Sequence, residues 1–94
     1  MDKLRNEETD LFFKCVLELK TLDECYDFFE DACTIKELQS IAQRVKVAKM
    51  LSEGKVYTDI ANETGASTAT ISRVGRSLNY GKDGYALIFS RVKK

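Results

Sequence analysis

The chain has 94 residues, 44% of them hydrophobic, with no proline, 5 glycines and no histidine. This length fits one domain, the scarcity of helix breakers excludes a turn-rich β-sandwich, and the lack of histidine argues against a hydrolase or a His-ligated metal site. The formal net charge is zero, but residues 1–40 hold 5 Lys/Arg and 11 Asp/Glu, whereas residues 41–94 hold 10 Lys/Arg and 4 Asp/Glu.

This uneven distribution of charge allows two interpretations. A basic second half is an electrostatic footprint suited to the phosphates of a nucleic acid. Alternatively, the acidic and basic halves neutralise each other within the fold or across a dimer. Charge alone leaves both open, and the motifs of the second half have to decide between them.

The cysteines and the amino terminus indicate the compartment. Cys15, Cys25 and Cys33 form no CxxC pair, and an odd number of cysteines argues against a disulfide framework. We expect these thiols to pack as small hydrophobic side chains in a reducing environment, and not to form a redox sensor. The start, "MDKLRNEETD", lacks the apolar core of a signal peptide, and no run approaches the ~18 apolar residues that span a bilayer. The expected location is the bacterial cytosol or nucleoid, with no membrane partner.

The first expected helix covers about residues 5–20. Its apolar residues fall on more than one face, whereas a surface helix of a monomer shows a single stripe. They are Leu11, Phe12, Phe13, Cys15, Val16, Leu17 and Leu19. This pattern predicts burial on several sides, and therefore a second chain.

The second expected helix begins at a capping box. In "TLDE", Thr21 caps the helix and Glu24 reaches back to the chain before it. The helix runs to about Asp31 with Cys25, Phe28 and Phe29 inward. Its carboxylates lack the spacing of a calcium loop, so we expect a solvated acidic face and no metal site. They are Asp23, Glu24, Asp27, Glu30 and Asp31.

A second capping box, "TIKE", starts a long central helix. Thr34 is its expected N-cap, Glu37 the reciprocal partner, and Gly54 a natural stop after about Glu53. Apolar residues at three- and four-residue spacing predict its buried stripe. They are Leu38, Ile41, Ala42, Val45, Ala48 and Leu51.

Two short helices follow, over about Asp59–Thr64 and Thr68–Leu78, with Thr58 as the cap of the first and a turn at Gly65. Small and apolar residues around the turn have the spacing of a helix-turn-helix, in which the second helix enters the major groove of DNA. These residues are Ile60, Ala61, Gly65, Ala66, Ile71 and Val74.

The amino end of the second short helix carries hydroxyls, a methyl group and arginines. Arginine is the usual reader of guanine, and short hydroxylated side chains approach bases or phosphates closely. The expected DNA-binding residues are Lys55, Tyr57, Thr58, Ser67, Thr68, Ala69, Thr70, Ser72, Arg73 and Arg76. The alternative is a helical adaptor, in which the same helix pair contacts another protein and no DNA. We expect no catalytic residues and no enzymatic activity.

The chain ends in a loop and a short helix. "NYGKDG", residues 79–84, is a loop by composition, and "YALIFSRVKK" forms an amphipathic helix within residues 84–94. Tyr80 and Tyr85 flank the loop and either pack against the helix-turn-helix or line a pocket.

From residue 34 to 78 the chain resembles the tryptophan repressor family, in particular its short YerC-type branch. "TIKELQSIAQRVKVAKMLSEG" resembles the central helix of the family and its glycine stop, and "GASTATISR" resembles its recognition helix. The resemblance implies an all-α, six-helix fold and an intertwined homodimer that binds a double-stranded operator. It implies one domain over residues 1–94, with dimerisation helices (1–33), a central helix (34–54), the helix-turn-helix (57–78) and a last helix (84–94). The implied role is transcriptional regulation, most simply repression.

The resemblance also implies effector residues. Two arginines that hold the indole of tryptophan in the family match Arg44 and Arg73, and we add Ser77 to this possible site. Val74 stands where tryptophan-binding members have glycine, and its branched methyl groups at the pocket wall clash with an indole. We therefore expect no required cofactor. A small-molecule corepressor stays open, and tryptophan is the less expected candidate for it. Alternatively, Arg44 is a solvated charge and Arg73 contacts phosphate without any ligand role.

Overall fold

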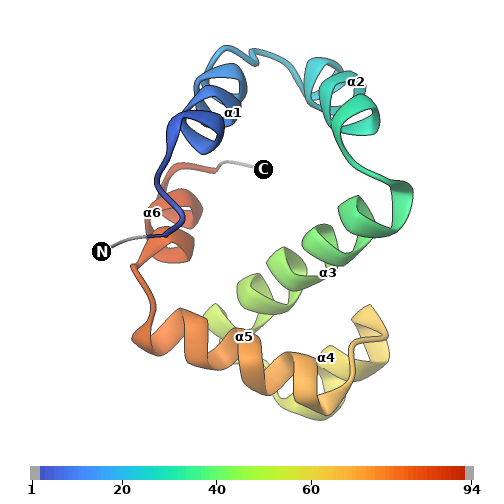
Figure 1. Ribbon diagram of the computed structural model, residues 1–94. Helices are drawn as coiled ribbons and strands as arrows, with labels where there is room; N and C mark the ends of the chain where they lie inside the picture. Colours follow the sequence, from blue (N-terminus) through green and yellow to red (C-terminus); the bar gives the residue numbers. More distant parts are fainter. Residues whose placement is uncertain (1–2, 93–94) are drawn as a thin grey trace. The chain divides into compact units, whose positions relative to one another are not determined.

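The computed structural model describes residues 3–92 of the chain. Across them the secondary structure is all-α, as predicted, without any strand (Figure 1). None of these helices is long and apolar enough to cross a membrane. The helices are α1 (Glu7–Leu17), α2 (Leu22–Ala32), α3 (Ile35–Ser52), α4 (Tyr57–Thr64), α5 (Thr68–Tyr80) and α6 (Gly84–Arg91).

The expected boundaries differ from the observed ones mainly near the ends of the chain. Helix α1 is shorter than the expected 5–20, while α5 continues to Tyr80 and shortens the loop that was expected over 79–84. Helix α6 ends at Arg91, and residues 93–94 of the expected last helix lie outside the described part. The chain divides into two compact units, residues 1–38 and residues 39–94.

Both predicted capping boxes are present in the first unit. Thr21 Oγ1 accepts a hydrogen bond from the Glu24 amide (3.1 Å), and Glu24 Oε1 accepts one from the Lys20 amide (2.9 Å). Thr34 Oγ1 accepts from the Glu37 amide (3.1 Å), and Glu37 Oε1 accepts from the Thr34 amide (2.8 Å). The Thr34 amide, and then its hydroxyl, hold the pKa of the Glu37 carboxyl below the ordinary 4.5. Each box satisfies amides that a helix start leaves without intrahelical partners.

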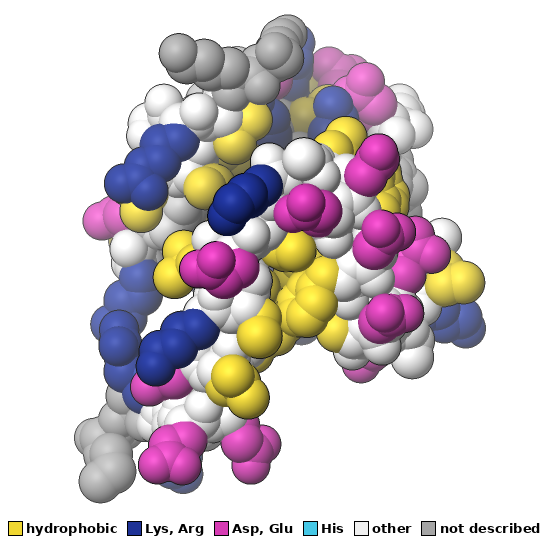
Figure 2. All heavy atoms as spheres, turned by 90° about the horizontal axis from the view of Figure 1, so that it is seen from above, with side chains coloured by type: hydrophobic (Ala, Val, Ile, Leu, Met, Phe, Trp, Pro, Cys, Tyr) yellow, Lys and Arg dark blue, Asp and Glu magenta, His cyan; other side chains and the backbone are white. Residues whose placement is uncertain are grey.

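Phenylalanine rings join α1 to α2. The Phe12 ring stacks on that of Phe28 (centroids 6.1 Å apart) and meets that of Phe29 edge-on (6.0 Å). No residue of α1 or α2 is fully buried, and apolar side chains (yellow in Figure 2) reach the surface beside acidic ones (magenta). The expectation that the three cysteines are buried is wrong for Cys15, which is exposed on α1, while Cys25 and Cys33 are half-buried. The contact between α1 and α2 therefore leaves much of their apolar surface exposed.

The second unit contains the hydrophobic core of the described residues. Burying a large aliphatic side chain contributes about 1.5–3 kcal/mol, so these contacts dominate its stability. The buried residues are Val47, Ala48, Met50, Ile60, Ala66, Ile71 and Val74.

The predicted stripe of α3 is only partly correct. Ala48 is buried and Leu51 packs against the core, but Ile41 and Val45 are exposed. Val47 and Met50, outside the predicted stripe, are buried instead. Apolar residues surround this helix on several sides, and contacts with the later helices select which side becomes the core.

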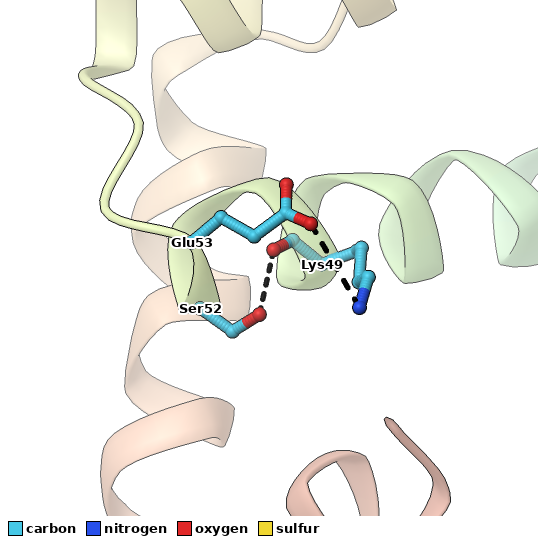
Figure 3. Close-up of polar contacts among 3 residues, drawn as sticks. All are labelled: Lys49, Ser52 and Glu53. Atoms are coloured by element: carbon cyan, nitrogen blue, oxygen red, sulfur yellow. Dashed lines mark hydrogen bonds and ion pairs between the residues drawn. The ribbon is translucent and has the colours of Figure 1, made fainter. Parts of the chain in front are cut away.

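Helix α6 is attached to the carboxyl-terminal part of α3 through aromatic contacts. The Tyr85 and Phe89 rings stack (centroids 5.7 Å apart) and pack against the core. Lys49 Nζ lies 5.2 Å from the Phe89 ring centroid and 3.8 Å from Glu53 Oε2. At the same helix end the Ser52 hydroxyl donates to the Lys49 carbonyl oxygen at 2.6 Å (Figure 3). Gly54 follows with φ +80°, the left-handed conformation expected of a glycine stop.

Candidate nucleic-acid interface

Helices α4 and α5 form the predicted helix-turn-helix (yellow and orange in Figure 1). Ile60 of α4 and Ile71 of α5 are fully buried, and Val74 is buried with them. Ala61 packs against the same cluster. These contacts fix the crossing of the two helices on the body of the unit, so α5 is held by its inner face alone and its outer face stays open.

The turn between α4 and α5 is built from glycine and hydroxyl groups. Gly65 adopts φ +74°, and its amide donates to the Ala61 carbonyl oxygen at 2.9 Å. The Thr64 hydroxyl donates to the Ile60 carbonyl oxygen (2.7 Å) and accepts from the Ala66 amide (3.1 Å). Glycine reaches the left-handed region without a steric cost, so the sharp reversal is compatible with an unstrained backbone.

Ser67 is the N-cap of α5. Its Oγ accepts from the Thr70 amide (3.1 Å) and donates to Thr70 Oγ1 (3.1 Å). The Ser67 and Thr70 hydroxyls were predicted to face DNA, and in the structure they also bond to each other at the start of α5. This cap fixes the start of the helix that would enter the groove.

The start of α4 differs from the prediction. The helix begins at Tyr57, with Val56 at the N-cap position and no side-chain capping bond, so Thr58 is not the cap. Thr58 lies inside the first turn, because α4 begins two residues earlier than expected. The first amides of α4 have no capping side chain, which suits contact with a phosphate oxygen.

Most of the predicted DNA-binding side chains are solvent-accessible, and none is fully buried. Thr70 and Ser72 are half-buried. The exposed ones are Lys55, Tyr57, Thr58, Ser67, Thr68, Ala69, Arg73 and Arg76.

The Tyr57 hydroxyl lies beside Gly75, near the middle of α5. A β-carbon placed on Gly75 would lie 3.6 Å from the Tyr57 Oη and 3.8 Å from Leu51 Cδ1. The end of this side chain thus contacts α5, while 43% of the residue's surface stays exposed. This arrangement keeps the Tyr57 hydroxyl at the edge of the helix-turn-helix.

Of the three predicted effector residues, Ser77 alone lines the cavity at the end of α5. Arg44 on α3 and Arg73 on α5 are exposed, whereas Ser77 lines an open cavity of about 470 Å³ at the junction of α5 and α6. Neither arginine lines this cavity. Its other lining residues are Gly81, Lys82, Gly84, Tyr85 and Ile88.

Val74, which the resemblance places at the wall of an effector pocket, belongs to the buried core of the unit. It is 3% exposed in the core beside Ile71, and it lines neither this cavity nor a second one beside α3. Its position three residues after Ile71 on an amphipathic helix turns its methyl groups inward. Of the two tyrosines, Tyr85 packs on the core and lines the cavity, while Tyr80 is 87% exposed.

Sequence reasoning missed one contact to the turn. Gln43 Nε2 on α3 donates to the Thr64 carbonyl oxygen at 3.1 Å. Both residues line the second open cavity, of about 420 Å³, together with Gln39, Ala42 and Lys46. No local pattern reveals a contact between residues 21 positions apart. The spacing of Gln39, Gln43 and Lys46 does place them on one face of α3, which was the available signal.

Comparison with known proteins identifies the family. The model of the Trp repressor protein family matches residues 7–93. YerC of Bacillus subtilis (strain 168) is 60% identical over 94 residues, which span all of this chain and 90% of that protein.

Solved structures agree with this assignment. A TrpR-like protein from Eubacterium eligens ATCC 27750 has a TM-score of 0.92 and 58% identity, covering 98% of both chains. A candidate Trp repressor from Staphylococcus aureus has a TM-score of 0.91 and 52% identity, covering 95% of this chain and 89% of that one. The six helices, the helix-turn-helix and these similarities together show that the chain belongs to the Trp repressor family.

Proposed function

We propose that this protein is a homodimeric, sequence-specific DNA-binding regulator of transcription, most simply a repressor. The observation that carries the proposal is the exposed amino end of α5, whose hydroxyls and arginines project from a helix fixed by Ile60, Ile71 and Val74. Membership of a family of helix-turn-helix regulators supports DNA binding at the level of the family. In a bacterium this activity is cytoplasmic, because the DNA lies there.

Each part of the surface has its own task in this proposal. Lys55, the Tyr57 hydroxyl, Thr58 and the first amides of α4 contact phosphates and set the register. The side chains along α5 meet base edges in the major groove, where a bidentate arginine–guanine contact discriminates by ~1–3 kcal/mol. The α5 residues assigned to this task are Ser67, Thr68, Ala69, Thr70, Ser72, Arg73 and Arg76.

A second copy of the chain completes the proposed regulator. Large apolar side chains of α1 and α2 are exposed, among them Leu11, Leu17 and Leu22. Covering them with a second copy removes this area from water, and two copies present two recognition helices about 34–36 Å apart, one turn of DNA. Light scattering tests this part, and a monomer mass at micromolar concentration would contradict it.

We also propose that operator binding requires no cofactor and that tryptophan is not the effector. Arg44 and Arg73 do not line the cavity that contains Ser77. Titration calorimetry of the purified protein with tryptophan should give no saturable heat. A saturable isotherm, lost in Arg44→Ala and Arg73→Ala, would establish the effector site that the resemblance implies.

Selection from random DNA is the central experiment. Duplexes retained by the purified protein should converge on a near-palindromic sequence with half-sites about 10 base pairs apart. Failure to retain any duplex at low salt would refute the regulator, and would favour the adaptor that uses the same helices to bind a protein.

A further inference from the structure

The hydrogen bond from Gln43 to Thr64 is the one side-chain bond, among those of residues 3–92, that joins α3 to the helix-turn-helix. Gln43 Nε2 lies 3.1 Å from the Thr64 carbonyl oxygen, and both residues are half-buried. Partial shielding from water makes such a bond more valuable than one at a fully exposed site. It is therefore a polar link between the central helix and the turn.

The acceptor is a carbonyl oxygen that needs a donor from outside its own helix. Thr64 is the last residue of α4, so its carbonyl has no donor within the helix. The Thr64 hydroxyl is already used, since it donates to Ile60 and accepts from the Ala66 amide. The Gln43 carboxamide supplies a donor for the Thr64 carbonyl oxygen. Thr64 is therefore held by hydrogen bonds to its carbonyl and to its hydroxyl.

Thr64 stands three residues before Ser67, the N-cap of α5. Because the turn is short and its Gly65 and Ala66 amides are hydrogen-bonded to α4, the position of the Thr64 carbonyl constrains where α5 begins. We propose that Gln43 is a positioning residue for DNA recognition, which sets the amino end of α5 relative to α3. This inference rests on the proposed function. It assigns a role in DNA recognition to a side chain that does not itself contact DNA.

Gln43 can be substituted without changing a residue of the buried core. The cavity that it lines contains no residue of the buried core, so a substitution here leaves the core packing intact. Gln39 lies one helical turn earlier on the same cavity wall, and none of the hydrogen bonds of the described residues involves its side chain. Gln39→Glu therefore matches Gln43→Glu in chemistry, charge and location.

The first measurement is affinity for the duplex that the unaltered protein selects from random DNA. A carboxylate at position 43 cannot donate and repels the Thr64 carbonyl, so Gln43→Glu should bind about tenfold more weakly than Gln39→Glu at pH 7.5. A protonated carboxyl donates again, so the difference should shrink to about threefold or less near pH 5. Equal affinities at pH 7.5, or a difference that does not change with pH, would overturn the proposal.

The second measurement is amide hydrogen exchange without DNA. In Gln43→Glu the amides of Ala66 and Thr70 should exchange about tenfold faster than in Gln39→Glu, while those of Val47 and Ala48 stay unchanged. Faster exchange with unchanged affinity would make Gln43 merely structural and overturn its positioning role. If the unaltered protein retains no duplex, the proposed function fails, and the exchange result still decides whether Gln43 orders the turn.

Discussion

The Ser77 carbonyl oxygen accepts a hydrogen bond from the Gly81 amide at 3.0 Å and leaves no space for a β-carbon on Gly81. A β-carbon there would collide with the Ser77 backbone, which cannot yield as a side chain can. The end of α5 and the wall of the cavity beside it therefore depend on this glycine.

Gly81→Ala should destabilise the protein by about 1–3 kcal/mol, because the chain must shift to relieve the clash. The melting temperature should fall by several degrees, at about 4–8 °C per kcal/mol for a domain of this size. Gly84→Ala is the matched control. A β-carbon placed on Gly84 would meet no atom within 4 Å, and this residue starts α6, so the melting temperature should be unchanged or higher. Similar losses in both variants would contradict the steric explanation.

Arg76→Ala should weaken operator binding by about 5- to 150-fold, the equivalent of a lost arginine–base contact. The Arg76 side chain is exposed on α5 and has no role in the core, so the melting temperature should not change. Arg91→Ala removes the same charge from α6, outside the helix-turn-helix, and should bind nearly as well as the unaltered protein. Gel-shift titrations measure both, and equal affinities would remove Arg76 from the interface.

Lys55→Ala should reduce the dependence of DNA binding on salt. The logarithm of the binding constant should fall with the logarithm of salt concentration, with a slope near −0.9 for each phosphate neutralised. Loss of one phosphate contact should make this slope shallower by about one. Affinity should decline by a similar factor for every duplex sequence tested, since phosphates carry no base identity. A slope equal to that of the unaltered protein would exclude this lysine from the phosphate contacts.

Glu37→Gln should lower stability at neutral pH and make little difference in acid. The hydrogen bonds of Thr34 lower the pKa of Glu37 in the folded state, so the carboxylate stabilises the fold above pH 4.5 and this contribution is lost as the pH falls through the lowered pKa. Glutamine retains the capping geometry but does not titrate. Urea unfolding from pH 7 to pH 3 should therefore show a smaller acid loss in the variant, and identical pH profiles would contradict the assignment.

The sequence by itself determined the features that depend on a few neighbouring residues. The capping boxes at Thr21 and Thr34 are correct, because a cap joins groups only three or four positions apart. Gly54 and Gly65, the predicted helix stop and turn, both adopt the left-handed conformation, which costs glycine little. The period of the apolar residues around Gly65 likewise predicted the inner faces of α4 and α5.

Only the tertiary structure decided which of several apolar faces is buried and which distant groups meet. Helix α3 buries Val47 and Met50 and exposes Ile41 and Val45, because the packing of α4, α5 and α6 selects one face. The bond from Gln43 to Thr64 follows from that packing. Local propensity acts within a helical turn, whereas these contacts require segments brought together by the fold.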